Sequence, residues 1–81
     1  MTTTTTEELV TGIVEHTALY ESSVGVRDRC VVFLQVNAQS RMLTFDADIR
    51  DHLPIGRRVQ LRFRLSADDH SMVTLLDRKI L

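Results

Sequence analysis

Residues 58–65 (RVQLRFRL) alternate between a polar and an apolar side chain without exception. Successive side chains of a β-strand point to opposite faces, so a period of two places every second residue on the same face. The apolar set comprises Val59, Leu61, Phe63 and Leu65, and the polar set comprises Arg58, Gln60, Arg62 and Arg64. This pattern predicts a strand that is buried on one face and open to solvent on the other.

The same period recurs along most of the chain, which predicts an all-β fold. We expect five strands, at about residues 9–20, 29–36, 41–47, 58–65 and 72–78. Gly12 lies inside the first strand, where a glycine usually marks a bulge or a sharp bend. A long, bent first strand is what the closure of a small barrel requires.

One short helical piece is expected at residues 48–53 (DIRDHL), between the third and fourth strands. Asp48 is placed to cap it, and Ile49 and Leu53 are spaced i, i+4 on one side. Pro54 follows and ends it after a turn or two. The predicted order is therefore three strands, a short helix and two strands.

The chain has 81 residues, enough for one domain. We expect residues 1–8, with their five consecutive threonines, to form a disordered tail and residues 9–81 to form a single small barrel. Cys30 is the one cysteine, so no disulfide forms within the chain, and a lone cysteine suits the reducing cytoplasm. Neither a secretory signal nor a bilayer-spanning apolar run is present, so no membrane partner is expected.

This order of elements resembles that of OB-fold proteins. The resemblance rests on Gly12 in a long first strand, on the Leu53-Pro54-Ile55-Gly56 entry to the fourth strand, and on the alternating residues 57–65. It is a similarity of pattern over nearly the whole ordered chain. It implies a five-stranded barrel whose outer face of strands two and three serves as the ligand platform. A small SH3-like or Sm-like barrel is the alternative, because one sequence does not reveal the pairing order of its strands.

Among OB families, the chain is similar to the small single-stranded-DNA-binding and primosomal proteins. Such proteins stack bases on exposed aromatic side chains and contact phosphates through basic residues. The resemblance implies that Phe33 is the stacking residue. The chain departs from those proteins because it has no Trp, a single Tyr and a net charge of −1. Any contact with nucleic acid must therefore use a local basic patch.

The predicted basic patch is a row of arginines, Arg58, Arg62 and Arg64, on the outer face of the fourth strand. Alternate residues of a strand lie roughly 6.6 Å apart, so these side chains form a linear array. Guanidinium groups bind phosphate through two parallel hydrogen bonds and stack on bases. The alternative is a solvated face that prevents edge-to-edge aggregation or pairs with acids such as Glu15 or Asp77.

Arg27 and Arg29, in or next to the loop at residues 21–28, would extend the basic surface. Phe33 has an alternative role as well. Both faces of residues 29–36 are largely apolar, so its ring is predicted either to stack on a ligand or to pack in a core or a dimer contact.

The sequence favours a protein without enzymatic activity, metal or cofactor. The acidic and histidine residues form no recognised ligand spacing; they comprise Asp46, Asp48, Asp51 and His52, and separately Asp68, Asp69 and His70. Cys30 lies in an apolar run, where a cysteine is usually an inert small hydrophobe. No activated nucleophile or acid–base pair is evident.

We therefore expect a non-enzymatic module that binds single-stranded nucleic acid through Arg27, Arg29, Phe33, Arg58, Arg62 and Arg64. The alternative is a protein–protein interaction module with an acidic partner, or a homodimer formed through the apolar second strand. A barrel that binds a small anion or metabolite is the third hypothesis, and the sequence reveals no convergent polar groups for it.

Overall fold

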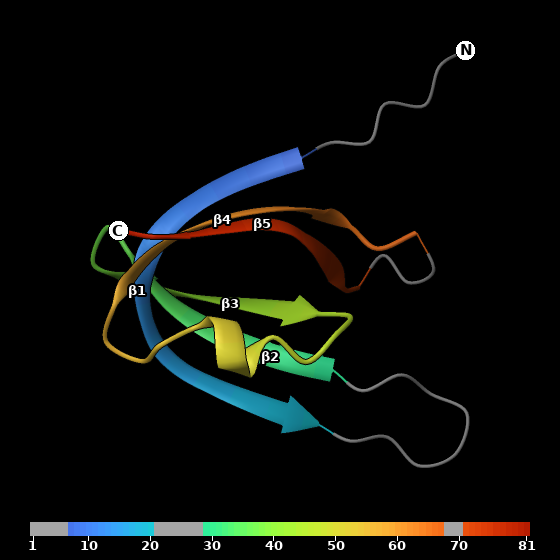
Figure 1. The fold of residues 1–81 in the computed structure, drawn as a ribbon, viewed down its shortest axis with the longest axis horizontal. Coiled ribbons are helices and arrows are strands. Elements are labelled where there is room, and N and C mark those ends of the chain that lie inside the picture. The colour runs from blue at the N-terminus through green and yellow to red at the C-terminus, as the bar shows by residue number, and fades with distance from the viewer. Residues whose placement is uncertain (1–6, 21–28, 68–70) are drawn as a thin grey trace.

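The computed structural model describes residues 7–20, 29–67 and 71–81. The predicted all-β fold with a short helical turn between the third and fourth strands is confirmed (Figure 1). Its elements are β1 (Glu7–Tyr20), β2 (Arg29–Val36), β3 (Gln39–Phe45), the 3-10 turn η1 (Arg50–His52), β4 (Arg58–Leu65) and β5 (Val73–Ile80). No helix long and apolar enough to cross a membrane occurs in these described ranges.

Strands β2 and β4 have the predicted bounds, and the others differ by one or two residues. β1 begins two residues before the predicted start of the barrel, because Glu7 and Glu8 pair with Arg64 and Phe63 of β4. The rest of the predicted tail, residues 1–6, lies outside the described residues.

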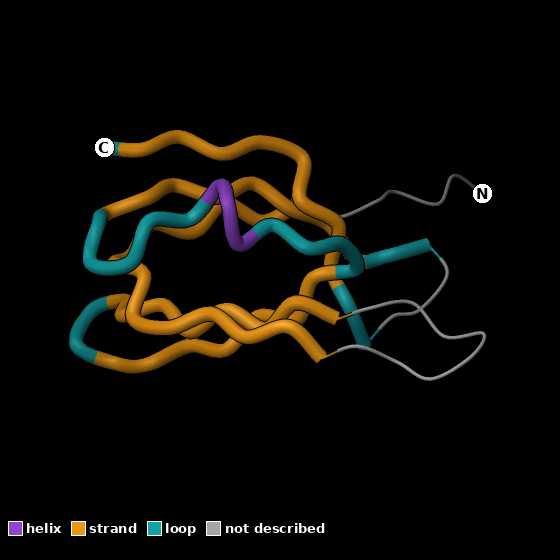
Figure 2. Tube along the Cα trace, turned by 60° about the horizontal axis from the view of Figure 1, so that its bottom comes forward, coloured by secondary structure: helices purple, strands orange, loops and turns teal. Residues whose placement is uncertain are grey.

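The five strands close into a ring in the order β1–β2–β3–β5–β4. Four of the neighbouring pairs are antiparallel, whereas β3 and β5 run parallel and share a single bridge, Phe45 with Val73. In Figure 2 the strands lie above and below the η1 turn. Because β3 and β5 share only this one bridge, the ring is least tightly closed between them.

Strand β1 belongs to both sides of the ring. Residues 7–13 pair with β4 and residues 13–20 pair with β2, so the strand changes partner beside Gly12. A Cβ atom on Gly12 would lie 2.8 Å from the carbonyl oxygen of Gln35 and 2.9 Å from Cγ2 of Val36. Gly12 thus permits a close approach of the two strands at the point where β1 crosses from one to the other.

The β-bulge of β1 lies after Gly12, between Val14 and His16. Before it, Val14 faces the core opposite Leu34; after it, His16 faces outward opposite Phe33. Strict alternation along β1 would place Val14 and His16 on one face, and the structure differs from this expectation. The bulge adds one residue to β1, which reverses the inward and outward alternation of everything that follows.

The core is formed by apolar side chains from β1, β2, β3 and β4 and from both sides of η1. It comprises Val10, Val14, Cys30, Val32, Leu34, Leu43, Phe45, Ile49, Leu53, Val59, Leu61 and Phe63. The rings of Phe45 and Phe63 meet edge to face, with centroids 6.1 Å apart. Cys30 is buried, and this burial raises the pKa of its thiol, as fits the predicted inert hydrophobe.

One end of the barrel is crossed by an ion pair between strands that are not neighbours in the ring. Arg41 Nη1 of β3 donates to Glu8 Oε2 of β1 at 2.5 Å, and the Arg41 guanidinium carbon lies 5.9 Å from the Phe63 ring centroid. Leu65 was predicted to face inward, but it is exposed at this same end, beyond the buried part of β4.

Glu8→Gln should lower stability at neutral pH and have little effect in acid. The hydrogen bond from Arg41 holds the pKa of Glu8 below its usual value of 4.5. A depressed folded-state pKa stabilises the protein above the unfolded-state pKa, and this contribution is lost as the pH falls through the folded-state pKa. The pair is about half exposed, so we expect a loss of no more than about 1 kcal/mol. Urea unfolding measured across the acid range would contradict this if the difference did not shrink as the pH falls.

Candidate nucleic-acid interface

The outer face of β2 and its two neighbours carries aromatic and apolar side chains. Phe33 lies opposite His16 of β1 and Met42 of β3. The rings of His16 and Phe33 are tilted by 32°, with centroids 6.0 Å apart. Phe33 is partly buried, whereas Met42 is 59% exposed and Tyr20 is 60% exposed. We call this surface the outer aromatic face; it comprises His16, Ala18, Tyr20, Phe33 and Met42, whereas Val31, on the same side of β2, is buried.

The arginine row projects from the outer face of β4, and Arg58, Arg62 and Arg64 are all exposed. Arg62 Nη1 lies 3.1 Å from Glu7 Oε1 of β1. For Arg58 and Arg64, the described part of the chain provides no ion-pair partner. The alternative of cross-strand pairing with an acid is therefore observed at Arg62, with Glu7 as the acid. Glu15 instead accepts a hydrogen bond from Ser40 Oγ at 2.8 Å.

The structure does not place Phe33 beside the arginine row. In the ring, β1 lies between β2 and β4, so it separates the outer aromatic face from the arginines. Arg29 is exposed at the start of β2, opposite Tyr20, at the border of the outer aromatic face. Arg27 lies outside the described residues.

A cleft of about 430 Å³ lies at β1, between the two surfaces. Gln35 is the partner of Ile13, and Ile13 is in turn the partner of Arg58, so these three residues form one cross-strand row. Neighbouring strands lie about 4.8 Å apart, which puts the backbones of Gln35 and Arg58 roughly 10 Å from each other. The residues that line the cleft are Thr11, Gly12, Ile13, Gln35, Asn37, Ala38 and Arg58, and none of these described residues is acidic.

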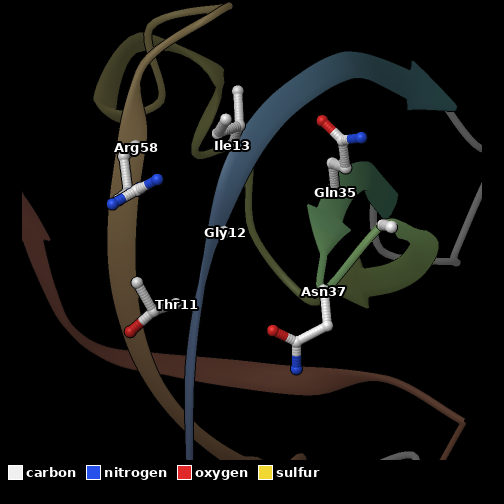
Figure 3. Close-up of a pocket in the computed structure, with 7 residues that line it drawn as sticks. Thr11, Gly12, Ile13, Gln35, Asn37 and Arg58 are labelled. Carbon is white, nitrogen blue, oxygen red and sulfur yellow. The ribbon is translucent and has the colours of Figure 1, made fainter.

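Figure 3 shows how the polar groups flank β1 at this cleft. Arg58 and Thr11 lie on one side of the strand, and Gln35 and Asn37 lie on the other. Gln35 is two residues from Phe33 along β2, so both belong to the same face. The cleft therefore lies between the outer aromatic face and the arginine row, with polar side chains on both sides of β1 and Ile13 between them.

The β2–β3 connection forms one rim of the cleft. It is a two-residue turn, Asn37-Ala38, with φ values of 50° and 67°. The predicted strand bounds left residues 37–40 between the second and third strands, which is two residues more than the turn contains. Asparagine tolerates the left-handed region, but alanine adopts it at a cost in strain, so the paired strands on either side must hold Ala38 in place.

Two acidic residues near η1, Asp46 and Asp48, are occupied by intramolecular contacts. Asp46 accepts a hydrogen bond from Thr74 Oγ1, and Asp48 accepts from the backbone amide and the guanidinium group of Arg50. Arg50 lowers the pKa of Asp48 through these bonds. Among the described residues, no three His, Cys, Asp or Glu side chains lie close enough to hold a metal ion. The other acidic and histidine group, Asp68, Asp69 and His70, lies outside the described residues.

Sequence reasoning missed three members of the outer aromatic face: His16, Tyr20 and Met42. His16 and Tyr20 face outward together because of the bulge between Val14 and His16. No residue type at that position predicts a bulge there. Met42 lies opposite Phe33 because the β2–β3 turn is two residues long. A recognised tight turn would have paired Met42 with Phe33 from the sequence alone.

No protein-family model, no curated protein and no solved structure matches this chain. The ligand of the interface is therefore inferred from its geometry and its chemistry.

Proposed function

We propose that this chain is an OB-type barrel that binds single-stranded nucleic acid with little sequence preference and catalyses no reaction. The ring order and the parallel β3–β5 pair support the OB assignment. OB folds are five-stranded, partly open Greek-key barrels that bind oligonucleotides on the face of strands two and three. The outer aromatic face occupies the corresponding position here.

The observation that carries the proposal is the position of Phe33. Its ring lies on the outer surface of β2 against His16, and the opposite residue, Met42, is exposed. Bases stack on such aromatic side chains whatever their identity, because every base has a flat π-face; each stack contributes about 1–3 kcal/mol.

The arginine row would supply the phosphate contacts. A nucleic-acid strand whose bases lie on the outer aromatic face would cross β1 at the cleft, next to Gln35 and Arg58. Its backbone would then continue along Arg62 and Arg64. Each phosphate that an arginine neutralises releases condensed counterions. Binding should therefore weaken steeply as the salt concentration rises, despite the net charge of −1.

Phe33→Ala should lower the affinity for a labelled oligothymidylate by roughly 5- to 100-fold, which corresponds to the loss of one stacked base. Fluorescence anisotropy at about 50 mM and 200 mM salt measures this effect. The matched control is Ile55→Ala, which truncates an exposed apolar residue between η1 and β4 and should leave the affinity unchanged. If the unmodified protein failed to bind at the lower salt concentration, the proposal would be refuted.

A second candidate function is suggested by the exposed, apolar character of Tyr20 and Met42. Such a surface also suits a protein partner, including a second copy of this chain. Light scattering separates the two functions. A mass that doubles with concentration in the unmodified protein, but not in Phe33→Ala, would assign the outer aromatic face to a homodimer.

A further inference from the structure

A second cavity, of about 350 Å³, lies at the end of the barrel that the Arg41–Glu8 pair crosses. The single bridge between β3 and β5 leaves the ring least closed here. The cavity is lined by the apolar residues Leu43, Phe63, Leu65 and Val73 and by the charged residues Glu8, Arg41 and Arg64. Barrel mouths that combine an apolar lining with a few polar groups are common sites for small molecules.

The charges of the described lining residues are not balanced. Among the lining residues that the structure describes, Arg41 and Arg64 contribute two positive charges and Glu8 contributes one negative charge, an excess of one positive charge. Arg41 is paired with Glu8, whereas Arg64 has no ion-pair partner in the described part of the chain. The Arg41 hydrogen bond also lowers the pKa of Glu8, so its carboxylate stays ionised further into the acid range.

We propose that this cavity binds a small amphiphilic monocarboxylate. Its apolar body would lie against Leu43, Phe63 and Val73, and its carboxylate would pair with Arg64. Glu8, on the same rim, would repel a second negative charge, which favours a monoanion over a dianion. The volume is at the small end of the usual range of about 300–1,000 Å³, which indicates a short acyl chain or a single aromatic ring.

This site is separate from the outer aromatic face. Its apolar lining comes from the inward-facing residues Leu43 and Phe63, whereas Phe33 faces outward from β2. Arg64 is shared with the arginine row, so the two activities are tested through different residues and ligands. The carboxylate proposal does not depend on the nucleic-acid proposal, and the failure of either leaves the other standing.

The test is a titration of the isotope-labelled full chain with hexanoate, followed by the NMR shifts of backbone amides. We expect saturable shifts centred on Leu43, Phe63 and Val73. The uncharged analogue 1-hexanol should bind about three- to tenfold more weakly, because it lacks the partner of Arg64. Non-saturating shifts, shifts centred on Phe33 and its neighbours, or equal binding of hexanol would each overturn the proposal.

Arg64→Gln should abolish the preference for hexanoate over hexanol. The matched control is Arg57→Gln, the same substitution at an exposed arginine just before β4 and away from the cavity; it should keep the preference. Both positions are exposed, and a well-dispersed amide spectrum verifies that each variant is folded. If Arg64→Gln retained the full preference, Arg64 would not be the anchor and the proposal would be wrong.

Discussion

Reversing two charges of the arginine row, with Arg62→Glu and Arg64→Glu together, should reduce the affinity for single-stranded oligonucleotide by at least about 100-fold at low salt. The double variant removes two phosphate contacts and places two carboxylates along the proposed path of the oligonucleotide. Each lost contact should also reduce the slope of log K against log salt by about 0.7, so the slope should fall by about 1.4. Anisotropy titrations over a series of salt concentrations measure both quantities.

The control for this experiment is Arg50→Glu. Arg50 belongs to η1 and pairs with Asp48, so its reversal changes the net charge without altering the row. We expect it to reduce affinity less than about threefold, through long-range electrostatics alone. If Arg50→Glu reduced the affinity as much as each substitution in the arginine row does, the nucleic-acid strand would not follow β4. If the chain forms a homodimer through the outer aromatic face, the double reversal should leave the dimer intact.

Phe45→Ala should lower the free energy of unfolding by about 3–5 kcal/mol. Phe45 is fully buried, meets Phe63 edge to face, and is the β3 residue that bridges to Val73. A domain of this length has a total stability of about 4–12 kcal/mol, so this one truncation should remove a large share of it. Urea unfolding followed by circular dichroism measures the change.

Phe33→Ala removes the same atoms from a partly exposed position and provides the comparison. We expect it to cost less than half as much as Phe45→Ala, because the hydrophobic contribution scales with the apolar area removed from water. If the two variants lost equal stability, Phe33 would be covered in solution, as in a homodimer. The stability and binding measurements therefore test the exposure of the outer aromatic face independently.

The strands that sequence analysis located best are those with the clearest burial pattern. β4 alternates throughout, and β2 combines inward Cys30, Val32 and Leu34 with polar residues beyond its end, so both strands have the predicted bounds. β3 was placed two residues late because its turn is Asn37-Ala38. The usual signal for such a turn is Asn-Gly or Asp-Gly, and alanine with a positive φ gives no such signal.

The candidate interface was predictable only in its local parts. The outward direction of Arg58, Arg62 and Arg64 follows from alternation within one strand. Their separation from Phe33 depends on β1 pairing with both β2 and β4, which is a non-local property of the ring. The cleft between them depends in addition on Gly12, whose missing side chain lets β1 pass close to Gln35.

The extra residue at position 15 decides which side chains of β1 a ligand can reach. If Glu15 were instead an ordinary residue of a strand without a bulge, His16 and Tyr20 would turn toward the interior, and Leu19 would turn toward solvent. The side chains of β1 that face outward after Val14 would then be a different set, although the amino-acid sequence would be the same. A change that removed the bulge but kept Glu15 would therefore displace the whole outward-facing set of β1 at once, whereas deletion of Glu15 itself would leave His16 opposite Phe33.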